Sequence, residues 1–538
     1  MPEESKEKPV LNLNVRFSIR GALAWLVGGG EFRPVFIILA FLVFFLIFNM
    51  PTSKSLEHLL TEPNPIGYAT EQNYTIVDHL SELFHNPDLT AEDVAQKVKI
   101  TTGMVALAAI LWGTVAIPLG ATGFLLAGIM YVFQLMPVDL IAKSYMKDAV
   151  FFIIGALSVA VGVEKTGLHN RIGLLFLGWT KGRRSLLFLF GPLMAIVAMF
   201  ISAKCLIAFL MPVLMRLYKN ICKANRLARH PPMGLFLILI IVYMTAMGGP
   251  GAPTVGARNA IMIGFFETLG KPMTFMQWMQ YGFWFVPVGS IAVGIFLYII
   301  FNKKIRDLTV NPGELIREET RTAEPYRGRQ VTMTVILVLV ILMWVFLDQY
   351  LRLGGPIIIG TVLMFLTGIV SWDDLNKGVA WGVIWMYAAA CSLGYVLYIT
   401  GTALWLATTA FDLLPSFMTN GEGLLISISI LTTVVTNFMS DGAAVAVIGP
   451  IALPMHKMAG LDIWQVGLAC AFSSSFAHVL VIGRPGLAIA YAMGVDPDTG
   501  ERLLRVGDLI KYGLGLVVIS WAILWGWTFY GYWRFMAF

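Results

Sequence analysis

Two charged residues occupy corresponding places in two apolar stretches of the chain. Lys204 lies within "FISAKCLIAF" (Phe200 to Phe209), and Asp441 lies within "TNFMSDGAAV" (Thr436 to Val445). A charged side chain at membrane depth costs roughly 2.5 to 3.5 kcal/mol on insertion scales, so such residues usually face a cavity and are paired. An ammonium and a carboxylate can neutralise each other, directly or through a bound ligand. We therefore predict that Lys204 and Asp441 bind a charged ligand and couple its binding to a proton.

Two arginines stand in segments that interrupt apolar runs with glycine and proline. Arg258 is in "GGPGAPTVGARN" (Gly248 to Asn259), and Arg484 is in "VIGRPG" (Val481 to Gly486). A guanidinium donates two parallel hydrogen bonds to a carboxylate or another oxyanion. Broken helices add the positive ends of their dipoles. The pattern predicts an anion site, although both arginines could instead only lock backbone carbonyls at the breaks.

Asp441, Lys204 and a further residue, His478, each have a purely structural alternative. Asp441 could cap the helix that follows it, using its carboxylate on free backbone amides. Lys204 could extend its amine toward the cytoplasm from a shallower position. His478, in "SSSFAHVL", could relay protons, but a lone membrane histidine is more often a packing residue.

The composition places all of these residues in a membrane protein. The chain has 57% hydrophobic and 13% charged residues, whereas soluble domains have about a quarter charged residues. Apolar runs of roughly 20 residues, enough to cross the hydrocarbon layer, recur from Val35 onward. The four cysteines have no paired spacing and the histidines do not cluster, so we expect neither a disulfide framework nor a metal site. The net charge of +6 is a topology signal and does not indicate nucleic-acid binding.

The charged loops predict the orientation of the chain. Residues 51–100 hold eight acids and three lysines, so this acidic loop should lie outside, after a first span at 34–50. Residues 1–33 then form a cytoplasmic leader. The segment 216–230 has five basic residues and no acid, so it should also lie inside. The same alternation leaves the C-terminus outside.

Two re-entrant hairpins are expected. The 31 residues between Arg184 and Arg216 are too many for one ordinary span and too few for two, yet both ends are basic. Two half-length helices satisfy both ends and place the tip at 202–204. A second such stretch runs from Leu424 to His456, with its tip at 440–442. Irregular backbone at this depth is tolerated only where it is buried in protein or lines a cavity.

The layout repeats itself. "SAKCLIAFLMP" from Ser202 matches "SDGAAVAVIGP" from Ser440, with serine and proline in register. We divide the chain into a first repeat at 101–301, a basic cytoplasmic loop at 302–330 and a second repeat at 331–538. An odd number of crossings separates the copies, so they should be inverted, as in secondary transporters. The predicted fold is an all-α polytopic membrane protein with about 11 transmembrane helices, two hairpins and helices broken at the midplane.

With these motifs, "FMQWMQYG" from Phe275 and "SWDDLNKG" from Ser371, the chain resembles the divalent anion/sodium symporter family over nearly everything after residue 100. The resemblance implies a homodimeric carrier of dicarboxylates, citrate or sulfate, and no enzyme. In that family each hairpin tip bears Ser-Asn-Thr, which contacts substrate and helps to build a sodium site. Each glycine-rich break of that family ends in Thr-Pro-Pro-Asn.

Carried over by position, the resemblance implies a substrate-binding set with several substitutions. The first tip reads Ser202, Ala203 and Lys204, and the second reads Ser440, Asp441 and Gly442. The breaks contribute Arg258 and Asn259 on one side and Arg484 and Pro485 on the other. An ammonium at Lys204 would repel sodium at a few ångströms, so we predict a degraded sodium site and no cofactor.

The function predicted from these residues is secondary active transport of small divalent anions by an elevator-type movement. Transport should not depend on sodium and should be coupled through proton symport or anion exchange. The protein should lie in the inner membrane of a bacterium. One alternative is a cation/proton antiporter or metalloid exporter of the same broad fold. Another is a non-transporting subunit of a larger complex that uses the acidic loop 51–100 for docking.

Overall fold

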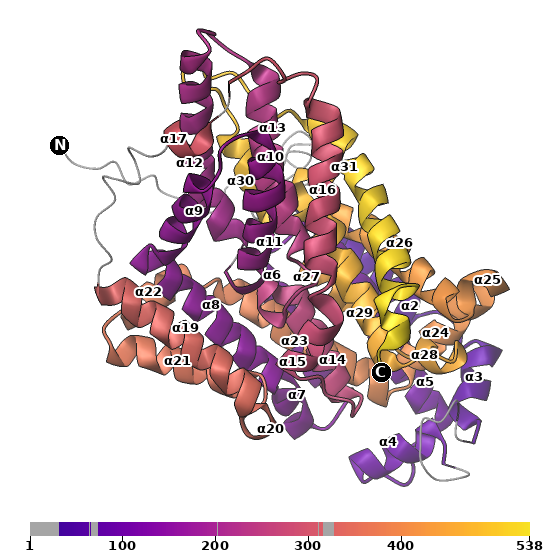
Figure 1. Cartoon of the computed structure of the whole chain (residues 1–538). Coiled ribbons are helices and arrows are strands. Elements are labelled where there is room, and N and C mark those ends of the chain that lie inside the picture. Colours follow the sequence, from indigo (N-terminus) through magenta and orange to yellow (C-terminus); the bar gives the residue numbers. More distant parts are fainter. Residues whose placement is uncertain (1–31, 64, 66–73, 202, 310, 316–327) are drawn as a thin grey trace, which may run out of the picture.

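A computed structural model describes residues 32–63, 65, 74–201, 203–309, 311–315 and 328–538, and Figure 1 shows their arrangement. These residues are mostly helical, and no extended strand is found among them; Val495 and Arg502 form an isolated bridge. Eight of the described helices are long and apolar enough to cross a membrane, and seven shorter ones are also apolar. The predicted all-α membrane fold is confirmed. Most of the predicted leader, residues 1–31, lies outside the described part of the chain.

The first half begins with scaffold-like helices and continues into a hairpin and a broken helix. Its elements are α5 (Ala91–Thr114), α6 (Leu119–Val132), α7 (Val138–Tyr145), α8 (Asp148–Thr166), α9 (Leu168–Gly178), α10 (Arg183–Ser185), η2 (Leu186–Phe190), α11 (Gly191–Phe200), α12 (Ala203–Ala224), α13 (Pro231–Met247), η3 (Pro253–Val255), α14 (Ala257–Thr268), α15 (Phe275–Gly282) and α16 (Phe285–Phe301). The segments α10, η2 and α11 follow one another without a gap and form one hairpin arm.

The second half has the same order of elements. They are α19 (Gly328–Phe346), α20 (Asp348–Leu351), α21 (Gly354–Leu366), α22 (Trp372–Gly378), α23 (Trp381–Ile399), α24 (Thr402–Leu413), α25 (Ser416–Thr419), α26 (Glu422–Phe438), α27 (Asp441–Ala452), α28 (Met455–Met458), α29 (Ile463–Ser473), η4 (Ser474–Phe476), η5 (Val481–Gly483), α30 (Pro485–Met493), α31 (Val506–Ala522), η6 (Ile523–Phe529) and η7 (Tyr532–Phe535). Helices α26 and α27 form the second hairpin, and α29 and α30 are the two pieces of the second broken helix.

Contacts between the halves are reciprocal. Helix α6 packs along α23 while α21 packs along α8, and α14 packs on α27 while α12 packs on α30. Small residues permit the close approach of these helices. A Cβ added to Gly123 would lie 2.7 Å from the carbonyl oxygen of Trp385, and one added to Gly155 would lie 2.5 Å from the side chain of Ile357. Each half therefore completes the packing of the other, as expected for two repeats related by a pseudo-twofold axis.

The two hairpins differ in the length of their arms. In the second, α26 and α27 are short, and α27 begins at Asp441 after the turn. In the first, α12 has 22 residues and continues past Arg216 to Ala224, so this arm is longer than the predicted half-length helix. The extension is amphipathic and carries the exposed residues Lys219 and Lys223. The apolar arm therefore continues into an end that faces water. The turn of the first hairpin follows Ile201, and Ser202 lies outside the described residues.

The predicted acidic loop contains folded helices. Helix α3 (Lys54–Thr61), helix α4 (Ile76–Phe84) and the start of α5 have N-caps at Ser53, Thr75 and Thr90. Their buried side chains, including Leu60, Leu80 and Val98, form a small core that also contacts Leu404 of α24. Helices α3 and α4 lie together at the lower right of Figure 1. The apolar first span appears as α2 (Pro34–Phe48), which packs along α5.

Candidate functional site

Four helices of the hairpins and breaks begin at the residues predicted to form the site. These helices are α12 at Ala203, α14 at Ala257, α27 at Asp441 and α30 at Pro485. The free backbone amides and the aligned peptide dipoles give a helix N-terminus about half a positive charge. Because α14 packs on α27 and α12 on α30, these ends are brought together in two pairs, each made from both halves of the chain.

Arg258 and Asp441 form an ion pair at the first of these helix pairs. Nη1 of Arg258, in the first turn of α14, contacts Oδ2 of Asp441, the first residue of α27. Arg258 is only 5% exposed. The other carboxylate oxygen accepts a hydrogen bond of 2.8 Å from the Gly442 amide. Ser440 is the N-cap residue, since its Oγ accepts from the amide of Ala443 at 3.4 Å. Asp441 is therefore more than a helix cap, because it links the two halves.

The glycines of the first break make room for the Arg258 guanidinium. A Cβ added to Gly249 would lie 2.7 Å from Nη2 of Arg258 and 2.5 Å from Oγ of Ser475. A Cβ added to Gly256 would lie 3.1 Å from Nη1 of Arg258. Only glycine allows the backbone to approach the guanidinium this closely. The glycine-rich sequence of the break thus serves to seat the arginine that follows it.

Arg484 brings a second guanidinium to the same region. It is the N-cap residue of α30, is 8% exposed, and interacts electrostatically with both Arg258 and Asp441. Two guanidiniums and one carboxylate leave this cluster with one net positive charge. Several buried polar atoms of the cluster have no hydrogen-bond partner among the described residues: Nε of Arg258, Nη1 of Arg484, Oγ of Ser475 and the Tyr387 hydroxyl. All four atoms carry a hydrogen that they could donate to an oxyanion.

Two asparagines hold the broken segments in place. The amide of Asn259 donates to the carbonyls of Gly249 and Ala252, at 3.0 and 2.8 Å. Asn437, just before the second tip, donates to the carbonyl of Phe476 at 3.2 Å and accepts from the amide of Val479 at 3.0 Å. Asn259 was predicted to bind substrate, and here its amide group is engaged with the backbone. Asn437 was not predicted; the signal for it was an amide inside the same apolar stretch as Asp441.

Tyr387 and Ser475 also lie at the site, although the sequence gives no signal that singles them out. A Cβ added to Gly442 would lie 3.2 Å from the Tyr387 hydroxyl, which places this side chain beside the second tip. Tyr387 is one of three tyrosines in the apolar helix α23, so its residue type gives no special signal. Ser475 is in a run of three serines, Ser473 to Ser475, and small hydroxyl residues in an apolar helix most often mark close helix packing. Only the tertiary structure brings both residues to the arginines.

Lys204 is not part of this buried cluster. It is exposed in the first turn of α12, and it forms no ion pair within the described part of the chain. Of the two ways in which Lys204 and Asp441 could neutralise each other, the direct contact is not found among the described residues. Helix α27 packs on α14, and the Asp441 carboxylate meets Arg258 instead. Ala203 is half-buried and Pro485 is exposed. His478 is fully buried with Nε2 at 3.3 Å from Oγ of Ser520, and its other ring nitrogen has no partner among the described residues.

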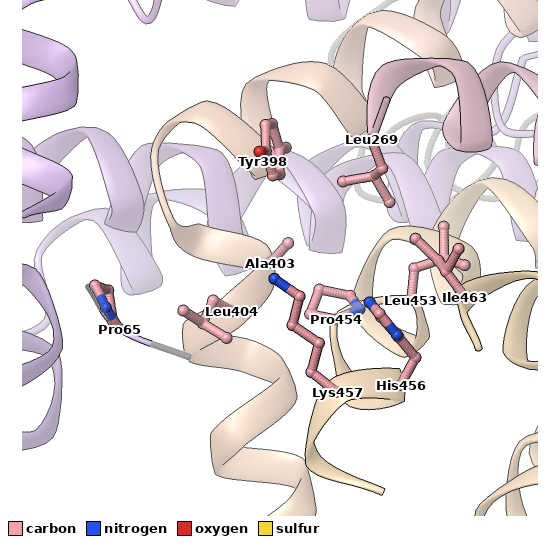
Figure 2. A pocket seen from close by; sticks show the side chains of 10 residues that line it. All are labelled: Pro65, Leu269, Tyr398, Ala403, Leu404, Leu453, Pro454, His456, Lys457 and Ile463. Carbon is pink, nitrogen blue, oxygen red and sulfur yellow. The ribbon is translucent and has the colours of Figure 1, made fainter. Parts of the chain in front are cut away.

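A separate pocket lies at the far end of α27 from Asp441 (Figure 2). Its volume is about 120 Å³. In Figure 2 the amine of Lys457 points toward Ala403, while Pro65 closes the opposite side. None of the predicted site residues lines this pocket. It lies between Pro65 of the segment 51–100 and the connection from α23 to α24, and it is separate from the arginine cluster.

Comparisons with known proteins identify the family of this chain. The family model of the sodium:sulfate symporter transmembrane region matches residues 89–533. The chain belongs to this family. It is the divalent anion/sodium symporter family that the motifs resemble, so the predicted family is confirmed. Its members are membrane transporters of anions, so this protein is an anion transporter and not an enzyme.

Individual relatives are distant but cover most of the chain. The sodium-dependent dicarboxylate transporter SdcS of Staphylococcus saprophyticus is 23% identical over 445 residues, or 76% of this chain and 82% of the relative. SdcS of Staphylococcus aureus is 23% identical over 448 residues, or 77% and 83%. Among solved structures, the Alcanivorax borkumensis YdaH transporter has a TM-score of 0.50 at 12% identity, covering 74% of this chain and 90% of YdaH. The YdaH likeness supports the family fold.

Proposed function

We propose that this member of the family carries small divalent anions, dicarboxylate or sulfate, across the membrane. The observation that carries the proposal is the buried cluster of Arg258, Arg484 and Asp441 at the N-termini of α14, α27 and α30. Guanidiniums bind carboxylate and sulfate oxygens in a bidentate manner, and helix ends add positive potential. The names of the relatives and of the family supply the same two substrate classes.

The charge of the cluster supports coupling to protons. Two guanidiniums can neutralise a divalent anion. They can do so only if the Asp441 carboxylate does not pair with Arg258 at the same time. Protonation of Asp441 would remove this competition and release the Arg258 guanidinium to the substrate. Binding of a divalent anion should therefore take up one proton. The groups around Asp441 that set this balance are Arg258, Arg484 and the Tyr387 hydroxyl.

We also propose that transport is independent of sodium, unlike that of the relatives named above. The first tip carries Lys204 and the second carries Asp441 and Gly442 where the family pattern has asparagine and threonine. These substitutions remove neutral oxygen ligands, and an ammonium nearby disfavours a second cation. Exchange of one anion for another is the coupling that remains if protons are not taken up.

The proposed movement is of the elevator type, in which the hairpins and broken helices slide against α8, α19 and α21. Inverted repeats around a midplane site support this movement. We propose a homodimer in the inner membrane of a bacterium, with the N-terminus cytoplasmic and the C-terminus outside. The bacterial relatives and the distribution of basic loops support this assignment.

Uptake of radiolabelled succinate and sulfate into proteoliposomes tests the proposal. We expect uptake driven by an inward proton gradient or by an internal counter-anion, with no change when sodium replaces potassium. Uptake that requires a sodium gradient and ignores pH and counter-anions would contradict the coupling. Cation-dependent proton release without any anion uptake would favour a cation/proton antiporter instead.

A further inference from the structure

A large apolar cavity lies next to the arginine cluster. Its volume is about 350 Å³, within the range of sites that hold drug-sized ligands. One wall is formed by α8, α19 and α21, which lie together at the lower left of Figure 1. The opposite wall is formed by the end of α11, the first break, and Val383 and Tyr387 of α23. The cavity therefore separates α8, α19 and α21 from the first hairpin and the first break, which are proposed to slide against them.

The lining is suited to hydrocarbon. It consists mainly of aliphatic and aromatic side chains, among them Phe152, Leu157, Val197, Leu337, Ile341 and Ile357. Two polar atoms of the lining are already engaged: Oγ1 of Thr254 donates to the Met199 carbonyl at 2.6 Å, and Nε1 of Trp344 donates to the Leu353 carbonyl at 3.0 Å. Among the described lining residues, these walls offer a small hydrophilic dianion few polar partners away from the arginine cluster.

One end of the cavity reaches the anion site itself. Gly256 and Ala257, which cap and begin α14, line both the cavity and the seat of Arg258. Tyr387 also lines the cavity, and its hydroxyl, which has no partner among the described residues, lies beside Gly442. A ligand whose charged group is bound by the arginines could extend an apolar portion from this end into the cavity.

We infer that the anions bound by this protein are amphiphilic, with an alkyl or aryl body attached to the carboxylate or sulfonate. This inference rests on the proposed anion site and specifies its ligand class. The charged group binds at Arg258 and Arg484, and the body fills the cavity between α8, α19 and the first hairpin. Short dicarboxylates such as succinate occupy the charged end alone and bind more weakly.

A homologous series of alkanesulfonates tests the inference, because the head group stays constant while the chain grows. We measure binding by calorimetry to the full chain in nanodiscs, from ethanesulfonate to octanesulfonate, with empty nanodiscs as the partition control. The dissociation constant should fall by about fourfold per methylene until the cavity is filled. The alcohols of the same chain length should not bind saturably.

Variants locate the effect in the cavity. Ala160→Phe fills the cavity and should remove the dependence on chain length, with the long members affected most. Val338→Phe, on the exposed side of α19, is the matched control and should leave the series unchanged. If Ala160→Phe does not fold, Ala156→Leu reduces the same space with a smaller side chain.

Each outcome decides between the two proposals. Affinity that is flat across the series, or equal for the alcohols, overturns the inference, while measurable binding of sulfate or succinate would keep the proposed function. Chain-length dependence that survives in both Ala160→Phe and Ala156→Leu also overturns it. If neither the sulfonates nor succinate and sulfate bind, the proposed function itself fails.

Discussion

Both hairpin tips lie at the N-terminus of a helix, but the charged residue is paired at one tip and exposed at the other. At the second tip, Asp441 opens α27 and its carboxylate is held by Arg258 and the Gly442 amide. At the first tip, Lys204 lies in the opening turn of α12 and is exposed. A helix N-terminus stabilises a carboxylate and repels an ammonium. The same backbone geometry therefore retains the acid inside the protein and turns the lysine outward.

Burial and the helix dipole both disfavour the charge of Arg258, so this arginine depends on the Asp441 carboxylate. Arg258 lies in the first turn of α14, where the dipole is unfavourable for a cation, and it is almost completely buried. Asp441 offsets both costs. The repeated framework fixes where helix ends gather, and individual side chains then decide which ligand is bound and whether a proton accompanies it.

The strongest way to break the second tip is Arg258→Ala. The change leaves the half-buried Asp441 carboxylate without its ion-pair partner; loss of one member of a buried pair typically costs about 3 to 5 kcal/mol of folding stability, an upper bound here. We expect a clear fall in melting temperature and no measurable anion uptake, measured by thermal unfolding and in proteoliposomes.

Its control is the double variant Arg258→Ala/Asp441→Ala. Because the pair acts as a unit, the double variant should recover part of the lost stability but none of the uptake. Lys204→Ala, at the other tip, should leave the melting temperature unchanged. A melting temperature that falls equally for Lys204→Ala and Arg258→Ala would show that the two tips are not different in this way.

Asp441→Asn tests the proton at the second tip, with a smaller effect. Asparagine resembles the protonated acid, so succinate or sulfate should bind at pH 8 about tenfold more tightly than to the wild type, or by roughly 1.4 kcal/mol. Calorimetry in buffers of different ionisation enthalpy should detect uptake of one proton by the wild type and none by the variant. Equal proton uptake by both proteins would rule out Asp441 as the proton site.

Ala203→Asn/Lys204→Thr restores the family pattern at the first tip. Removing the ammonium should let sodium stimulate uptake, by about fivefold or 1 kcal/mol, whereas the wild type should not respond. Lys204→Ala alone serves as the control, since it removes the charge without adding ligand oxygens. Sodium stimulation of the wild type itself would show that the exposed position of Lys204 leaves a sodium site intact.

The smallest expected effect concerns a surface pair that joins the two halves. Lys165, at the end of α8, contacts Asp374 of α22, and this contact with the Ser371 hydrogen bonds lowers the pKa of Asp374 below its usual value. A lowered carboxyl pKa gives stability at neutral pH that is lost as the pH falls through the folded pKa. Asp374→Asn should therefore lower the melting temperature slightly at pH 7. The difference from the wild type should shrink in acid, and a constant difference would contradict this origin.

Much of the architecture follows from local sequence patterns. Apolar runs, basic loops and glycine breaks were enough to place the helices, the two hairpins and the duplicated order, because these features depend on hydropathy and on backbone chemistry close in sequence. Arg258 and Arg484 were identified for the same reason, since a guanidinium in an apolar context requires a partner. The helices α3 and α4 within the predicted loop were missed, because their amphipathic segments are short and polar.

The partner of each charge was decided only by the tertiary structure. Asp441 meets Arg258 across a sequence separation of 183 residues because α14 and α27 come from different halves and pack together. Ser475 meets Arg258 and Gly249 through the same packing between the halves, whereas Tyr387 and Asn437 are placed by contacts within the second half. The apolar cavity exists only where α8, α19 and the first hairpin meet. The sequence by itself determined which residues need partners. Interhelix contacts, which no local pattern encodes, determined which partners they found.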